Sequence, residues 1–119
     1  MSGSRLAVYA AAYPAAQAFL GTWAASLRAQ TDRDFDLWVT LDGLPVERLR
    51  RSLDDLDRVQ VVQPPPGGAT PGRLRALAIE QLVERYDAVV FVDVDDELEP
   101  SRVAAARQAL REWDLTGCR

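Results

Sequence analysis

Hydrophobic residues follow two patterns along this chain. Short runs rich in β-branched and aromatic residues predict strands, and longer stretches with an apolar residue at every third or fourth position predict amphipathic helices. The strands are predicted at residues 5–11, 35–41, 58–62 and 88–92. The helices are predicted at residues 15–30, 45–56, 72–86 and 101–113. Strand and helix therefore alternate along the whole chain.

This alternation predicts an α/β domain with a mostly parallel sheet of about four strands, because parallel strands need a crossover that a helix usually supplies. We expect a Rossmann-like fold of three layers, α/β/α. The strand at residues 88–92 is the most continuously apolar, which fits a central strand covered on both faces. The segment 63–71 is rich in proline and glycine and predicts a loop. With 119 residues the chain has room for one domain, expected to cover residues 1–119.

Charge and residue types exclude several function classes. The 14 basic and 18 acidic residues give a net charge of −4, so a surface that neutralises nucleic-acid phosphates is not expected. All basic residues are arginine, which excludes a Schiff-base lysine and a P-loop lysine. No apolar run is long enough to span a bilayer, and no secretory leader is recognisable at the N-terminus. We expect a cytoplasmic protein, with peripheral contact to a membrane left open.

Any metal site would be built from oxygen ligands. Histidine is absent and Cys118 is the only cysteine, which excludes an internal disulfide and a site of thiolate ligands. Cys118 has no histidine to activate it and is interpreted as an incidental thiol. Oxygen ligands favour the hard divalent cations Mg²⁺, Mn²⁺ or Ca²⁺.

Candidate chemistry lies where the predicted strands end, because open α/β sheets bind ligands beyond the carboxyl ends of their strands. The first strand ends at Ala11, shortly before Tyr13, and the second is followed by Asp42. The fourth strand runs directly into an acidic segment. Parallel strands bring these ends to one edge of the sheet. We therefore expect these residues to face one cleft.

The acidic segment is the sharpest signal in the sequence. Asp93, Asp95 and Asp96 follow the fourth strand at once, and carboxylates so close together repel one another unless a cation or hydrogen-bond donors compensate. A divalent cation shared with a diphosphate would compensate well. The structural alternative is a solvated loop whose acids cap the next helix. The buried strand in front of the acids favours the metal site.

Two further positions have a functional and a structural interpretation. Asp42-Gly43 is a turn signal, but Asp42 could also accept a hydrogen bond from a nucleobase N–H or a ribose hydroxyl. The glycine-rich loop before Gly72 and the start of the following helix, with Arg73 and Arg75, could bind a phosphate. No nucleotide-binding glycine motif is present there, so a plain loop is an equal alternative.

Together these features resemble the nucleotide-sugar-binding, N-terminal half of family 2 glycosyltransferases, which have the GT-A fold. The resemblance extends over almost the whole chain. Its most specific part is the sequence VFVDVDD at residues 90–96, which resembles the segment that contains the family's DXD motif. The other segments are residues 19–20 with 26–31, residues 35–43 and residues 72–78. Pro14 and Ala78 depart from the family's usual residues.

The resemblance implies a nucleotide-sugar site. Asp93 and Asp95 would be the DXD pair, holding the ribose and a Mn²⁺ or Mg²⁺ ion, and Asp96 could take over the metal. Asp42 would contact the base. The remaining residues implied to bind the nucleotide sugar are Ala11, Tyr13, Arg73 and Val94. The donor would be a nucleoside-diphosphate sugar, in the first place a UDP-sugar, and the acceptor is unknown.

Two functions remain open at this point. The first is a metal-dependent glycosyltransferase, or its donor-binding half. The family's acceptor-binding half, with the catalytic base of inverting members, has no counterpart in these 119 residues, and no catalytic residue is assigned. The second is a non-catalytic or truncated nucleotide-sugar-binding or assembly module, whose exposed sheet edge pairs with a second copy or another subunit. A phosphotransferase of the haloacid dehalogenase type is disfavoured, because it would carry its DxD on the first strand.

Overall fold

Parallel strands form one sheet in the order β3-β2-β1-β4, with β1 and β2 at its centre. The structure, a computed structural model, describes residues 5–56, 58–68 and 70–116, with residue 71 and residues 111–116 described by their backbone only. The strands are β1 (Leu6–Ala12), β2 (Asp36–Leu41), β3 (Val59–Val62) and β4 (Ala88–Phe91). Each strand lies close to its predicted position. Cys118 lies outside the described residues.

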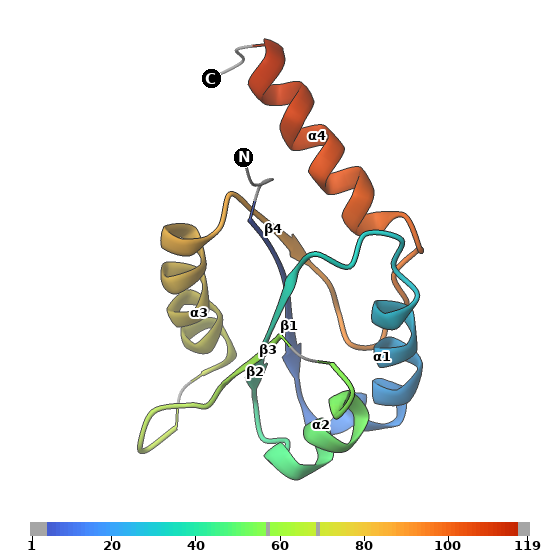
Figure 1. The fold of residues 1–119 in the computed structure, drawn as a ribbon. Helices are drawn as coiled ribbons and strands as arrows, with labels where there is room; N and C mark the ends of the chain where they lie inside the picture. The colour runs from blue at the N-terminus through green and yellow to red at the C-terminus, as the bar shows by residue number, and fades with distance from the viewer. Residues whose placement is uncertain (1–4, 57, 69, 117–119) are drawn as a thin grey trace.

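Helices cover both faces of this sheet, which confirms the predicted α/β fold (Figure 1). In the view of Figure 1, α3 lies on one face, α1 and α2 lie on the other, and α4 extends away beyond β4. The helical elements are η1 (Pro14–Phe19), α1 (Leu20–Arg28), α2 (Val46–Leu53), α3 (Pro71–Arg85) and α4 (Arg102–Thr116). Among the described helices, none combines the length and the apolar character needed to cross a membrane.

The core has two parts, because successive side chains of a strand point to opposite faces of the sheet. On the side of α1 and α2, the core includes Val8 of β1 and the fully buried Trp23 of α1. On the side of α3, it includes Tyr9 of β1, Trp38 of β2 and Leu82 of α3. β1 is therefore buried on both faces, and this fixes the position of its carboxyl end.

The predicted central position of the strand at residues 88–92 is wrong. In the described sheet, β4 is an edge strand and pairs only with β1. Val90 is buried on the side of α1, whereas Phe91 lies on the side of α3 and is 45% exposed. Both faces of β4 are partly covered, so its side chains show the apolar pattern of a central strand. The apolar pattern of a strand does not show whether its backbone pairs with a neighbouring strand on one side or on both.

The helix predicted at residues 15–30 is divided into two elements. The 3₁₀ helix η1 begins at Pro14, and α1 follows it. Proline fits the first turn of a helix because its missing N–H would have no partner there. The tighter 3₁₀ winding takes Phe19 out of line with Trp23, and 46% of Phe19 is exposed instead of facing the core.

A buried glutamine connects the end of α1 to the segment that follows β4. Gln30 is 3% exposed, and its Nε2 atom donates a hydrogen bond to the carbonyl oxygen of Glu99 at 2.7 Å. Its Oε1 atom accepts the backbone N–H of Val103, near the start of α4, at 3.0 Å. Beside it, the backbone N–H of Thr31 donates to the carbonyl oxygen of Pro100 at 2.8 Å. These bonds hold the segment between β4 and α4 against the body of the domain.

A second polar cluster lies where β2 begins. The Asp36 carboxylate accepts a hydrogen bond from the Tyr86 hydroxyl and another from Nε of Arg58, the latter at 2.6 Å. Nε1 of Trp38 donates to the Tyr86 hydroxyl oxygen at 3.0 Å. Burial by itself raises the pKa of Asp36, but the hydrogen bonds from Tyr86 and Arg58 outweigh it and lower this pKa below its ordinary value of 3.8. The cluster thus favours the ionised form of Asp36.

We expect Gln30→Ala to lower the free energy of unfolding by about 1–3 kcal/mol, because it leaves the Val103 N–H without its partner and removes one of the hydrogen bonds to the Glu99 carbonyl oxygen. Urea denaturation at neutral pH measures this change. Gln81→Ala, at an exposed position of α3, is the control and should change the free energy by less than about 0.5 kcal/mol. Equal losses in the two variants would contradict the role given to Gln30.

Asp36→Asn should flatten the dependence of stability on acid pH. Folding lowers the pKa of Asp36. The ionised carboxylate therefore contributes fully to the free energy of unfolding above pH 3.8, the ordinary pKa, and this contribution is lost as the pH falls below that value. The wild type should therefore lose more stability than the variant between about pH 5 and pH 2. Denaturation curves across this range test it, with the exposed Asp54→Asn as control. Parallel pH profiles of wild type and Asp36→Asn would refute the prediction.

Candidate functional site

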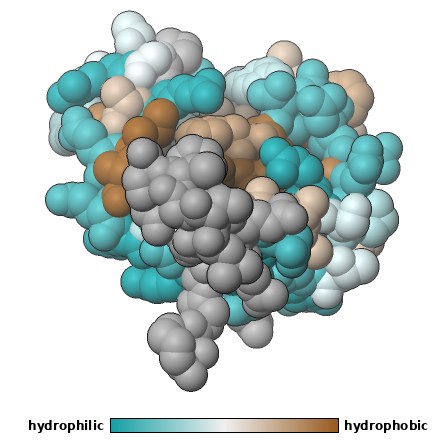
Figure 2. Space-filling view, turned by 90° about the horizontal axis from the view of Figure 1, so that it is seen from above, coloured by the Kyte–Doolittle hydropathy of each residue, from teal (hydrophilic) through white to brown (hydrophobic). Residues whose placement is uncertain are grey.

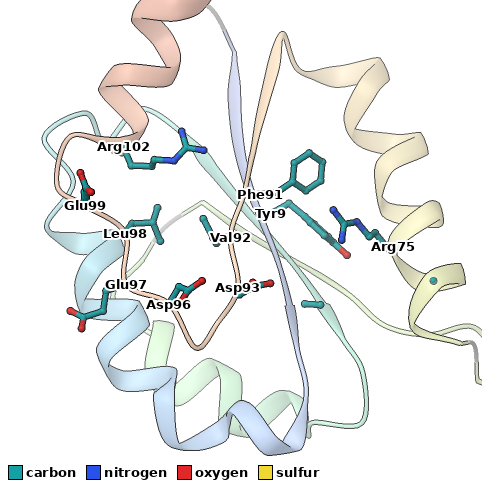
Figure 3. Close-up of a pocket in the computed structure, with 12 residues that line it drawn as sticks. Tyr9, Arg75, Phe91, Val92, Asp93, Asp96, Glu97, Leu98, Glu99 and Arg102 are labelled. Carbon is teal, nitrogen blue, oxygen red and sulfur yellow. The ribbon is translucent and has the colours of Figure 1, made fainter.

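A cleft lies where the strand order reverses, between the carboxyl ends of β1 and β4. In open α/β sheets this is the place at which ligands bind. The cleft has a volume of about 860 Å³ and extends over both sides of β4, from α3 to the segment that leads into α4 (Figure 3). Tyr9, Ala11 and Phe91 line it along the strands. Its charged lining residues are Arg75, Asp93, Asp96, Glu97, Glu99 and Arg102.

The predicted acidic cluster is formed at the end of β4. Asp93, Asp95 and Asp96 each place a carboxylate oxygen within 4.8 Å of the others, and all three side chains are exposed. The backbone N–H of Asp96 donates to the carbonyl oxygen of Asp93 at 3.0 Å and closes a turn. Val94, between the acids, is 1% exposed and points into the core. A buried valine thus anchors the turn and directs its acidic neighbours outward.

The structural alternative is a solvated loop whose acids cap the next helix. The exposed acids fit a solvated loop, but they do not cap α4. The first amides of α4 have other partners: the N–H of Arg102 donates to the carbonyl oxygen of Glu99, and that of Val103 donates to Gln30. Within the described part of the chain, no hydrogen bond or ion pair holds the carboxylates of the acidic cluster. Their mutual repulsion is therefore balanced by solvent or by a bound cation.

A second corner forms at the ends of β1 and β2. The backbone N–H of Asp42 donates to the carbonyl oxygen of Ala12 at 2.8 Å. Gly43 has a φ of +89°, and a Cβ atom built there would lie 3.4 Å from Cδ of Pro14, so both conformation and space favour glycine. Tyr13 and Asp42 therefore lie at the same edge of the sheet as the acidic cluster, on the other side of β1. Neither residue lines the cleft itself.

Of the two arginines considered at the start of α3, Arg75 lines the cleft and Arg73 does not. Arg73 is exposed and does not line the cleft. Its backbone N–H donates a hydrogen bond to Oγ1 of Thr70, the residue that caps α3. Arg75 lines the cleft together with Gly72. Helical spacing could have decided between the two arginines, because residues three apart in a helix, such as Gly72 and Arg75, share a face. In the same way, Tyr9 is two residues before Ala11 on β1 and shares its face.

The charges around the cleft do not balance. Four carboxylates and two guanidinium groups line it, and Asp95 adds a further carboxylate next to it. An anionic ligand would be repelled by this surplus unless a cation accompanied it. Hard divalent cations bind carboxylate oxygens, so the residues present fit Mg²⁺ or Mn²⁺. Asp93, Asp95 and Asp96 are the residues that would hold such an ion.

No protein-family model matches the sequence, and no curated protein matches it either. Solved structures do match. The fold is similar to that of S. aureus TarS, a family 2-like glycosyltransferase. For TarS 1–349 the TM-score is 0.75 at 20% identity, over 92% of this chain and 33% of that chain. The TarS 1–349 complex with UDP-GlcNAc gives the same TM-score and identity.

The longer TarS structure gives a TM-score of 0.69 at 23% identity, over 92% of this chain and 20% of that chain. The chain thus spans about a third of the length of TarS 1–349. The similarity shows that this chain has a glycosyltransferase-like fold, and it confirms the structural resemblance expected from the sequence.

Removing one charge from the acidic cluster should leave the fold intact. We expect Asp95→Asn to have an unchanged or higher melting temperature in EDTA, because the variant relieves repulsion among the carboxylates. Mn²⁺ should raise the melting temperature of the wild type more than that of the variant. Glu47→Gln, at an exposed position of α2, should respond to Mn²⁺ like the wild type. Unfolding of Asp95→Asn would show instead that this acid is structural.

Proposed function

We propose that this chain binds a nucleoside-diphosphate sugar with a divalent cation and forms the donor-binding part of a glycosyltransferase. The observation that carries the proposal is the position of Asp93, Asp95 and Asp96, which gather at the cleft where the strand order reverses. The similarity to TarS, whose solved structures include complexes with UDP-GlcNAc and with UDP, supports a UDP-sugar as donor.

Each candidate residue has a role in this proposal. Asp93 and Asp95 bind the cation and the ribose, and Asp96 is a further metal ligand. Asp42, at the end of β2, accepts a hydrogen bond from the base. Val94 contributes through its backbone, because its side chain is buried.

Ala11 and Tyr13 lie at the end of β1 and border the space between the acidic cluster and Asp42. Ala11 lines the cleft, and its small side chain leaves room for a ligand there. Tyr13, between β1 and η1, is half-buried against the core. Arg73 belongs to the anion-attracting start of α3.

A bound cation supplies positive charge that stabilises the departing nucleoside diphosphate while the sugar is transferred. The protein's part is to fix the cation ligands, and it does so through the buried Val94 and the hydrogen-bonded turn from Asp93 to Asp96. A turn whose backbone is already fixed needs little rearrangement when the metal and the donor bind.

The alternative is a binding or assembly module of the same fold without transfer activity. Two features favour it: β4 is an edge strand of the described sheet, and Phe91 on this strand is one of the exposed large hydrophobic residues. The face seen in Figure 2 also has a hydrophobic region at its middle, with hydrophilic residues around it. An unpaired strand edge next to apolar surface favours contact with another chain.

UDP titration in the presence of Mn²⁺ tests the proposal. We expect the wild type to bind UDP, and we expect Asp93→Asn and Asp95→Asn to lose at least about tenfold in affinity, because each removes a charged ligand of the cation. Isothermal titration calorimetry measures the affinities, and circular dichroism verifies that the variants are folded. EDTA should reduce UDP affinity of the wild type to a similar extent.

Glu47→Gln is the matched control for the loss of one exposed negative charge, and it should bind UDP like the wild type. Absence of UDP binding by the folded wild type, with Mn²⁺ present, would reject the donor-binding function and favour the assembly module. If neither aspartate substitution changes the affinity for UDP, then UDP binds at a site other than the acidic cluster.

A further inference from the structure

β3 is the edge strand at the far side of the sheet from β4, and in the described sheet it pairs only with β2. The N–H of Leu37 in β2 donates to the carbonyl oxygen of Arg58, just before β3, at 2.8 Å. Because successive residues of a strand direct their backbone groups to alternate sides, the N–H and C=O groups of Val59 and Val61 face away from β2. The outer edge of β3 therefore presents donors and acceptors placed symmetrically about Gln60.

An apolar groove lies along this edge, between β3 and α2, and has a volume of about 580 Å³. Its apolar lining residues are Leu49, Leu53, Leu56, Val59 and Val61. Val59 and Val61 are only partly buried against the core on the side of α1 and α2, whereas Gln60 between them is exposed. A strand added at this edge would cover both valines and pair the outward backbone groups.

Two opposite charges border the same groove. Arg50 and Asp54 are one turn apart on α2, and both line it. Both side chains are exposed, and among the described residues neither takes part in an ion pair, whereas the neighbouring Asp55 is paired with Arg28. A matching partner needs a negative group opposite Arg50 and a positive group opposite Asp54. Another copy of α2, turned to run in the opposite direction, has its charges in this order.

We propose that β3 pairs with β3 of a second copy of this chain, antiparallel and about a twofold axis at Gln60. Val59 of one copy then lies opposite Val61 of the other, and the outward donors and acceptors of both edges are used. The same axis sets the two α2 helices antiparallel, so that Arg50 of each copy faces Asp54 of the other. Backbone, apolar groove and charges are thus all complementary to a copy of themselves.

The edge at β4 lacks this self-complementarity. Asp87 comes directly before β4, and Asp93 follows shortly after it. Antiparallel pairing of two β4 strands would bring the Asp87 end of one copy to the Asp93 end of the other, and like charges opposed across strands are destabilising. Pairing at β3 also leaves the cleft open, because β2 separates β3 from β1 and β4. The inference is therefore independent of the proposed function.

Sedimentation equilibrium of the 119-residue chain at low ionic strength tests the pairing. We expect a monomer–dimer equilibrium with a dissociation constant of about 1–500 µM, because a short pair of strands buries a small interface. Arg50→Asp and Asp54→Arg should each raise this constant at least about tenfold, because each sets like charges opposite one another. Circular dichroism verifies that the variants are folded.

An equimolar mixture of Arg50→Asp and Asp54→Arg is the decisive sample. Opposite charges again face each other in the mixed dimer, so the mixture should associate with an affinity close to that of the wild type. Arg48→Asp is the matched control, since it reverses an exposed charge of α2 that does not line the groove. This variant should dimerise like the wild type.

Amide hydrogen exchange of the wild type locates the paired edge without any substitution. Raising the protein concentration through the dissociation constant should slow exchange at Val59 and Val61, whose amides become hydrogen-bonded in the dimer. The outward amides of β4, at Val89 and Phe91, are the internal control and should exchange at a rate independent of concentration.

Three results would overturn the inference. The first is a wild type that remains monomeric over the whole concentration range. The second is a dimer that both charge reversals leave unchanged, or a mixture of the two variants that does not associate. The third is slower exchange at Val89 and Phe91 in place of Val59 and Val61, which would assign the contact to β4. None of these measurements involves UDP, so the donor-binding function stands or fails separately.

Discussion

The buried amide of Gln30 holds together the parts of the chain on which the site depends. Its nitrogen and its oxygen both bond to backbone groups around the start of α4, and Thr31 adds a bond beside it. The acidic turn lies between β4, which fixes one end, and this junction, which fixes the other. Gln30 and Thr31 belong to one segment that resembles family 2 glycosyltransferases, and the acidic turn belongs to another. In the structure, residues that follow the acidic turn form hydrogen bonds with Gln30 and Thr31.

Most of the fold could be predicted from the sequence, because strand and helix patterns reflect which side chains are buried. The alternation of elements, the parallel sheet and the core position of Trp23 and Trp38 all follow from such patterns. Strand order could not be predicted in the same way. β4 has side chains covered on both faces, but its backbone edge is unpaired in the described sheet, and backbone pairing leaves no mark on hydrophobicity. Phe19 is exposed although it lies four residues before the buried Trp23, because that periodicity assumes α-helical winding and Pro14 begins a 3₁₀ helix.

Some residues of the site could be predicted from the sequence and others could not. Asp93, Asp95 and Asp96 were predictable because they are neighbours in sequence and follow a strand, and the parallel topology then brings Asp42 to the same edge. The contacts that complete the cleft join residues far apart in the chain. The position of Arg75 depends on Phe91, and that of Phe91 on Tyr9, and no local spacing connects α3 to β4 and β1. Side-chain contacts between such distant residues can be predicted only when the order of the strands is known.

The way in which the acidic turn is anchored has a consequence for folding. Gln30 meets Glu99 and Val103 across 69 and 73 residues of sequence, and closing so long a loop costs more entropy than closing a short one. The hydrogen bonds of α1 and the pairing of β1 with β2 need far less of the chain. We therefore expect the turn to take its final place after the central strands have paired, so that ligand-binding competence is acquired in a late folding step.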